Sequence, residues 1–150
     1  MKLYHGTHYL LPCAFELKPQ DNGYAHQPET QKLEDFIELH RPFEKLSRKK
    51  SVFLSDDIDL IDPAGGYTDA VYMVEVEKAE KSDLAWYTHA QVMLEEGNAY
   101  EAEQAAINYW SGIPFGVTAE RCPEYRCNTA TVVTIVELNV DMDELDQVAQ

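Results

Sequence analysis

The sequence predicts an α+β fold, because strand-like and helix-like segments are mixed along the chain without regular strand–helix alternation. Two segments rich in valine and other β-branched residues, 70–76 and 131–140, indicate strands. Between them lies the pattern of an amphipathic helix, with an apolar face made of Ala102, Ala105, Ala106, Tyr109 and Trp110. A chain of 150 residues, 45% of them hydrophobic, is expected to form one domain over residues 1–150.

In the N-terminal half, short strands and polar loops are expected. Leu3–His5 is an apolar start typical of a strand, and residues 51–54 are a second strand candidate. Turn-forming residues predict a loop over 19–28. A helix around residues 33–37 follows, where apolar side chains recur at helical spacing before Pro42 stops the run.

The rest of the chain is expected to contain an acidic loop, two capped helices and an acidic end. Residues 55–66 predict an acidic loop. A capping box that begins at Thr88 predicts the start of one helix, which Gly97 ends, and Asn98 is expected to cap the next helix. The acidic tail 141–150 contains no basic residue, and we expect it to fray.

The charge of the chain disfavours nucleic acid as a partner. The formal net charge is −15, and beyond residue 50 there are four basic residues against twenty acidic ones. Such a surface repels phosphates as a whole. Half of the basic residues lie between positions 32 and 50. Of these, the cluster Arg48–Lys50 is interpreted either as a solvated loop before a strand or as a contact for a phosphate-bearing ligand.

Several other classes of protein and site are not indicated. No run approaches the ~20 apolar residues of a membrane span, and the N-terminus does not resemble a signal peptide. Three cysteines, Cys13, Cys122 and Cys127, cannot all pair, which favours a reducing cytosol, so a cytoplasmic location is expected. Zinc held by Cys122 and Cys127 is disfavoured by their spacing, and no metal site is expected. The common phosphate-loop, zinc-hydrolase and nucleophile-elbow motifs are absent.

Three polar residues stand near the ends of predicted strands. His5 precedes Gly6, and a glycine there lets a ligand approach the backbone closely. Tyr67 follows two glycines, where its ring would either cover a flat ligand or join the core. Glu124 lies shortly before the long C-terminal strand, a place where most glutamates are merely exposed. Taken singly, none of the three indicates a function.

Taken in order, the segments around these residues resemble the His-Tyr-Glu branch of the ADP-ribosyltransferase superfamily. Its first motif, a strand ending in His-Gly-Thr, is matched by Leu3–Thr7. Its second, a strand, a loop with a tyrosine and a further strand, is matched by 52–55, Tyr67 and 70–76. Its third, a Glu-Tyr pair ahead of a β-rich segment, is matched by Glu124–Tyr125. The small size and the helical insertion are similar to bacterial and phage-encoded members.

The resemblance implies a split mixed or antiparallel sheet with peripheral and inserted helices. It also implies a mono-ADP-ribosyltransferase that uses NAD as co-substrate and moves ADP-ribose to an acceptor, which we expect to be a protein. The opening Tyr-His-Gly-Thr is also similar to the rifamycin-modifying transferases, so a small-molecule acceptor stays open. The related tRNA 2′-phosphotransferases need a basic surface for RNA, and this chain offers one small basic segment, so this alternative ranks low.

The resemblance also assigns roles to residues. Glu124 would be the catalytic carboxylate, which stabilises positive charge on the ribose as the nicotinamide bond breaks. Tyr67 would stack on the cationic nicotinamide ring, although the loop after Phe53 is long enough that Tyr72 is an alternative. His5 would hold the adenosine ribose, and the backbone of Gly6 would clamp the carboxamide. Thr7 and Ser55 complete the residues assigned to NAD.

Two alternatives are weighed against this interpretation. The sister Arg-Ser-Glu branch needs a Glu-x-Glu loop, but 75–77 and 101–103, which spell it, fall in a predicted strand and a predicted helix. That branch is therefore rejected. The other alternative is an acidic, non-catalytic binding or inhibitor protein that acts through its charge on a basic partner. It accounts for the net charge but not for the order of the three motifs.

Overall fold

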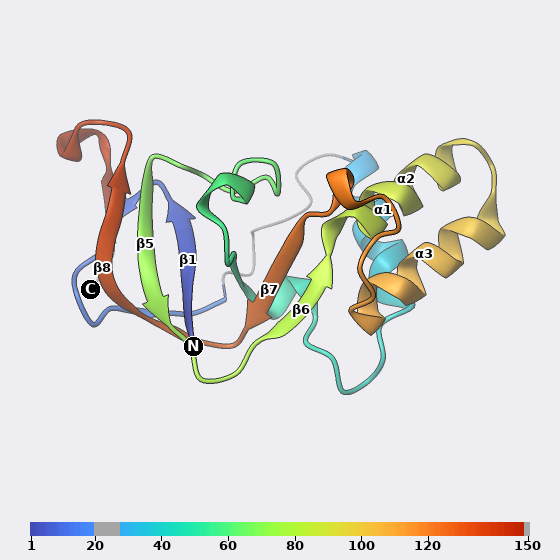
Figure 1. Ribbon diagram of the computed structural model, residues 1–150, viewed down its shortest axis with the longest axis horizontal. Helices are drawn as coiled ribbons and strands as arrows, with labels where there is room; N and C mark the ends of the chain where they lie inside the picture. Colours follow the sequence, from blue (N-terminus) through green and yellow to red (C-terminus); the bar gives the residue numbers. More distant parts are fainter. Residues whose placement is uncertain (20–27, 149–150) are drawn as a thin grey trace.

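The computed structural model describes residues 1–19 and 28–148. Two antiparallel sheets and a group of three helices make up most of this part of the chain (Figure 1). The α+β class is confirmed. The first sheet has the order β1-β5-β8-β3 and consists of β1 (Lys2–Thr7), β3 (Glu16–Leu17), β5 (Ala70–Glu75) and β8 (Ala130–Leu138). The second has the order β4-β7-β6 and consists of β4 (Val52–Leu54), β6 (Glu80–Asp83) and β7 (Pro123–Cys127).

A backbone bridge joins the two sheets. Tyr4 of β1 and Ser55, which follows β4, exchange backbone hydrogen bonds of 2.8 and 2.9 Å. In Figure 1, β1, β5 and β8 lie on one side of the molecule, and β6 and β7 run from there toward the helices. The bridge therefore holds the first strand of the chain beside the end of β4.

The helices lie beside the second sheet. α2 packs against β7 and α3 against β6 (Figure 1). The helices are α1 (Pro28–Leu39), α2 (Leu84–Glu95) and α3 (Ala99–Ser111). Short 3-10 helices are η1 (Arg48–Lys50), η2 (Ile58–Leu60), η3 (Thr118–Glu120) and η4 (Met142–Glu144).

The predicted apolar face of α3 is confirmed, since all five of its residues are buried. Four of them, all except Ala102, belong to a helical core that also contains Leu33 and Ile37 of α1. The indole nitrogen of Trp110 donates a hydrogen bond of 2.7 Å to the carbonyl oxygen of Ile37. A buried indole needs such a partner, and this one ties α3 to α1. A second core cluster draws its members from both sheets, with Val74, Cys127 and Val132 among them.

The predicted start of α2 at Thr88 is wrong. The helix begins at Leu84, and the side chain of Asp83 caps it by accepting a hydrogen bond of 3.0 Å from the backbone nitrogen of Ala85. The Asp83 carboxylate is buried and also accepts from the backbone nitrogens of Cys122 and Phe115, at 2.8 and 2.9 Å. A capping box is a local signal, and here the contacts to residues far along the chain decide the boundary.

We expect Asp83→Asn to lower the free energy of unfolding by about 2 kcal/mol. Asp83 Oδ1 accepts hydrogen bonds from the backbone nitrogens of Ala85 and Cys122, and the amide oxygen of an asparagine can accept the same two bonds. Oδ2 accepts a hydrogen bond from the backbone nitrogen of Phe115. The NH₂ group of an asparagine in that place would face this N–H, which is also a donor. Urea unfolding of this variant beside Asp143→Asn, at an exposed position, measures the difference. Equal stability of the two variants would contradict the buried cap.

The acidic tail is ordered up to residue 148, so the expectation that 141–150 frays is wrong for its described part. β9 (Asp146–Gln147) pairs parallel with β2 (Tyr9–Leu10), and Leu145 is buried. The hydrogen bonds come from backbone groups, which composition does not reveal. Residues 149–150 lie outside the described residues.

The remaining predictions are met in part. The strands expected at 51–54, 70–76 and 131–140 are present as β4, β5 and β8, and Asn98 caps α3 with a hydrogen bond to Glu101. β6 and β7 were not expected. Most of the loop predicted over 19–28 lies outside the described residues. In the described ranges, no helix is both long enough and apolar enough to cross a membrane.

Candidate functional site

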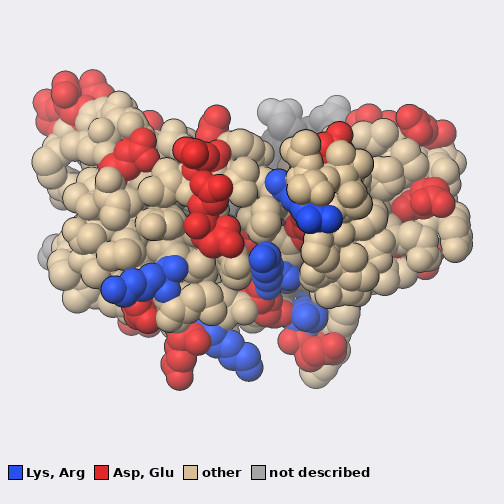
Figure 2. Space-filling view, viewed as in Figure 1, with Lys and Arg blue, Asp and Glu red and all other residues tan. Residues whose placement is uncertain are grey.

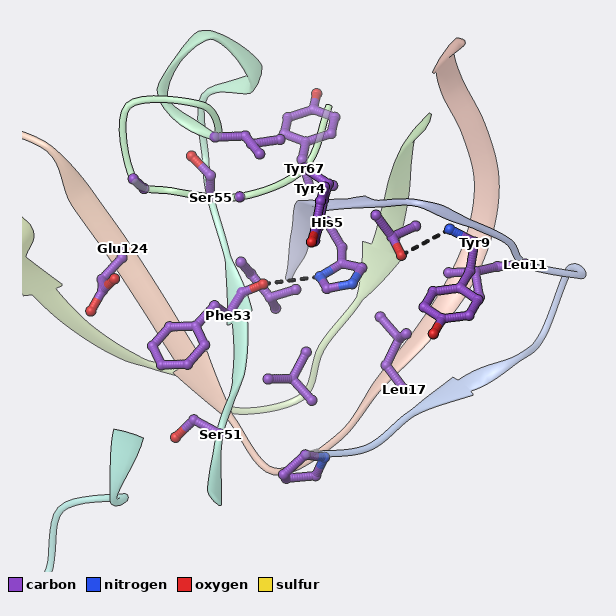
Figure 3. Close-up of a pocket in the computed structure, with 18 of the residues that line it drawn as sticks. Tyr4, His5, Tyr9, Leu11, Leu17, Ser51, Phe53, Ser55, Tyr67 and Glu124 are labelled. Atoms are coloured by element: carbon purple, nitrogen blue, oxygen red, sulfur yellow. Dashed lines mark hydrogen bonds between the residues drawn. The ribbon is translucent and has the colours of Figure 1, made fainter. Parts of the chain in front are cut away.

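A pocket of about 700 Å³ lies where the ends of β1 and β4 meet the start of β7 (Figure 3). The loop after η2 and the segment around β3 complete its walls. This volume is within the range of small-molecule sites. Six of the seven residues assigned to the site from the sequence line this pocket: His5, Gly6, Thr7, Ser55, Tyr67 and Glu124. The seventh, Tyr72, is not among its lining residues.

His5 presents one ring nitrogen to the pocket as an acceptor. Its Nδ1 lies 3.0 Å from the carbonyl oxygen of Phe53 (Figure 3), and because a carbonyl can only accept, Nδ1 carries the proton. Burial lowers the pKa of His5 below its ordinary 6.5, although the bond to Phe53 acts in the opposite direction. At neutral pH the ring is therefore neutral, and Nε2 can accept a hydrogen bond from a ligand hydroxyl.

Gly6 lacks a side chain because a neighbouring loop packs closely against it, and not because a ligand needs space there. A Cβ atom at this position would overlap the backbone carbonyl oxygen of Tyr67 and would lie 2.7 Å from Cγ2 of Ile61. The expectation that this glycine leaves space for a ligand is thus corrected, since the Tyr67 loop fills that space. The absence of a side chain at Gly6 instead sets how closely the loop sits on β1.

The ring of Tyr67 stands at the mouth of the pocket, and the side chain is 67% exposed. Figure 3 shows it above His5 and Ser55. The loop that carries it is anchored at Asp69, whose Oδ2 lies 2.5 Å from Nδ1 of His8. This contact raises the pKa of His8, which also lines the pocket. An exposed aromatic ring on an anchored loop is suited to cover a flat ligand.

Tyr72 is excluded as a stacking residue by its burial. Its side chain is 2% exposed, and its hydroxyl accepts a hydrogen bond from the backbone of Leu11 and donates one to the carbonyl of Tyr9. It therefore supports the chain after β1 from within the core. Thr7 and Ser55 line the pocket, but their hydroxyls bond the nearby backbone, that of Tyr9 and Asp57 respectively.

Glu124 is a strand residue and is buried, not exposed in a loop as its sequence context suggests. It lies on β7, where side chains alternate between the two faces. Tyr125 points to the opposite face and its hydroxyl donates to Asp56. Glu124 is 5% exposed and lines the inner end of the pocket, beside the ring of Phe53 (Figure 3).

The carboxylate of Glu124 belongs to a buried polar cluster that sequence analysis missed. Its Oε1 accepts from Nη1 of Arg48 and from the hydroxyl of Tyr109, each at 2.5 Å. The guanidinium of Arg48 also binds Glu34 on α1, at 3.1 Å. The interpretation of the basic cluster 48–50 as a solvated loop is therefore wrong for Arg48, which is buried. Lys49 and Lys50 are exposed.

The pocket carries little positive charge. Among its described lining residues, Lys18 is the one lysine or arginine. His8 also lines the pocket, and any positive charge on its ring is paired with the carboxylate of Asp69. Glu124 and Glu16 are the acidic lining residues. In the described part of the chain, no three histidine, cysteine, aspartate or glutamate side chains are close enough together to hold a metal ion. The chemistry of this pocket therefore rests on one buried carboxylate, one neutral imidazole and an exposed aromatic ring.

Comparison with known proteins adds no relative to this picture. No protein-family model matches the chain, and no curated protein matches it significantly. The resemblance to the ADP-ribosyltransferase superfamily thus stays a prediction from three short motifs, and the geometry of the pocket is the ground on which a function is proposed.

Proposed function

We propose that this protein is a mono-ADP-ribosyltransferase that cleaves NAD and transfers its ADP-ribose to a protein. The observation that carries the proposal is the convergence of three distant segments, around His5, Tyr67 and Glu124, on one pocket. Their order along the chain first indicated this activity.

Each side chain has a property that the reaction needs. Breaking the bond between nicotinamide and ribose builds positive charge on the sugar, and a buried carboxylate such as Glu124 stabilises it. The exposed ring of Tyr67 offers an aromatic face to the cationic nicotinamide. Nε2 of His5 can accept from a ribose hydroxyl. The leaving nicotinamide keeps the electron pair of the broken bond, and the acceptor forms the new bond to ribose and loses a proton.

Incubation of the purified protein with NAD carrying a labelled adenosine, in the presence of cell lysate, tests the proposal. Release of nicotinamide together with labelling of a discrete protein band is the expected result. Release without labelling would indicate hydrolysis of NAD, and labelling of a small molecule would indicate the rifamycin-type alternative. A folded protein that neither releases nicotinamide nor binds NAD would overturn the proposal.

The affinity for NAD is expected to weaken as the pH falls below 6.5. The lowered pKa of His5 keeps its ring neutral until the pH passes below this ordinary value. Protonation then turns Nε2 from an acceptor into a donor, which costs a ribose contact of about 1 kcal/mol, or roughly five-fold in affinity. Calorimetric titration in the Glu124→Gln background avoids turnover. His5→Asn should abolish the pH dependence, and the same dependence in that variant would contradict the role of His5.

An acidic surface next to the pocket favours the second candidate, a binding protein for a basic partner. Asp56, Asp57, Asp59 and Glu137 line a shallow hollow of about 620 Å³, and acidic side chains cross this face in Figure 2. Such binding would weaken steeply with salt. It would also be indifferent to Glu124→Gln but sensitive to Asp57→Asn combined with Asp59→Asn, so these variants separate the candidates.

A further inference from the structure

The carboxylate of Glu124 accepts two hydrogen bonds from the helical side of the molecule. Both donors to its Oε1 are buried, and they come from different elements, Arg48 from η1 and Tyr109 from α3. Oε2 has no hydrogen bond within the described residues. One oxygen of the carboxylate is thus held by the protein, and the other is left for whatever occupies the pocket.

The direction of the Tyr109 hydroxyl is fixed by its neighbours. Its oxygen accepts hydrogen bonds from Nη1 of Arg48 and from Nη1 of Arg126, at 2.5 and 3.0 Å. With both acceptor positions facing guanidinium groups, the single O–H points to Glu124. Burial, together with the charge of Glu124, raises the pKa of Tyr109, so the phenol keeps this proton at physiological pH.

Arg48 is held in turn by three aromatic rings and an acid. Its guanidinium carbon lies 4.9, 4.7 and 5.5 Å from the ring centres of Phe53, Tyr87 and Tyr109. Glu34 binds Nε and also accepts from the hydroxyl of Tyr87 at 2.9 Å. Phe53 lines the pocket, so the same group of side chains reaches from α1 to the wall of the site.

We propose that Tyr109 and Arg48 are positioning residues for Glu124, and that the helices exist in part to aim its Oε2 at the ribose. This inference rests on the proposed function. A carboxylate that stabilises a developing charge works best when it is already oriented before the reaction, because reorientation then costs nothing. Arg48 binds Oε1, which leaves Oε2 as the oxygen that would face the ribose, and it places a positive charge beside the carboxylate.

A matched pair of variants tests this role. Tyr109→Phe and Tyr87→Phe each remove one partly or fully buried hydroxyl from the same cluster and keep the ring near Arg48. Only the first hydroxyl touches Glu124. We expect Tyr109→Phe to lower kcat for nicotinamide release at least about 10-fold with KM for NAD within three-fold. Tyr87→Phe should keep kcat within two-fold. Arg48→Lys, which keeps the charge but loses the planar fork, should show the same selective loss of kcat.

Equal kcat values for folded Tyr109→Phe and wild type would overturn the inference, as would equal losses in both phenylalanine variants. If wild type itself releases no nicotinamide, the proposed function fails. The contact between Tyr109 and Glu124 is then tested by NMR on the protein without NAD. There the carbonyl ¹³C resonance of the Glu124 side chain, assigned with Glu124→Gln, is expected to move in Tyr109→Phe and not in Tyr87→Phe. An unmoved resonance in Tyr109→Phe would then overturn it.

Discussion

Glu124→Gln is expected to lower the rate of nicotinamide release at least about 100-fold, the scale on which loss of one transition-state contact acts. The substitution removes the charge but keeps the size and one oxygen. That oxygen can still accept from Arg48 and Tyr109, and Arg48 keeps its second carboxylate partner in Glu34. The protein should therefore fold, and its affinity for NAD should change little.

The measurement is the release of nicotinamide followed by chromatography, with NAD affinity determined separately by calorimetry. Glu120→Gln is the matched control, because Glu120 lies on η3, shortly before β7, and is exposed. Its rate should equal that of wild type. A Glu124→Gln protein that is folded, binds NAD and turns over at the wild-type rate would remove Glu124 from the mechanism.

Arg48→Met is expected to lower the free energy of unfolding by about 3–5 kcal/mol, a large part of the stability of a domain of this size. The change deletes the guanidinium that lies between Glu34 and Glu124. Both carboxylates are buried, at 2% and 5% exposure, and would be left as charges with no cation between them. Methionine keeps much of the volume, so the loss reports the charge more than a cavity.

Lys49→Met is the control for this prediction, because it removes the neighbouring positive charge from an exposed position. Lys49 lies 3.9 Å from Asp35, and both side chains are at least half exposed, so less than about 0.5 kcal/mol is expected. Urea unfolding of the two variants gives the comparison. Similar stabilities would mean that the Arg48 cluster contributes no more than a surface ion pair. Restoration of stability by adding Glu34→Gln and Glu124→Gln to Arg48→Met would show that uncompensated charge is the cause.

The fold class and several elements could be predicted because their signals are local. The spacing of the apolar residues within α3 predicts its buried face, and Asn98 caps that helix as its position indicates. The start of α2 could not be predicted, because Asp83 is selected as the cap by its bonds to Phe115 and Cys122, about thirty to forty positions away. The order in the acidic tail likewise depends on a partner strand at the other end of the sequence.

The site was predictable only as a set of candidates. The resemblance selected His5, Tyr67 and Glu124, and these line one pocket. It could not find Arg48, because an arginine in a run of three basic residues is the usual pattern of a solvated segment. Its burial depends on Glu34 and Glu124, which lie 14 and 76 positions away. A run of charges shows how many ions are present but not which of them has a buried counterion.

The pocket draws its walls from Tyr4 at one end to Val148 at the other, with the central segment 51–67 between them. A chain emerging from the ribosome therefore lacks the complete site until residue 148 has left the exit tunnel. Since nearly every wall comes from a different stretch of sequence, partial products of synthesis or of proteolysis should be unable to consume the nucleotide pool of the cell. For an enzyme proposed to consume NAD, late assembly of this kind would confine the activity to chains that contain the whole stretch from Tyr4 to Val148.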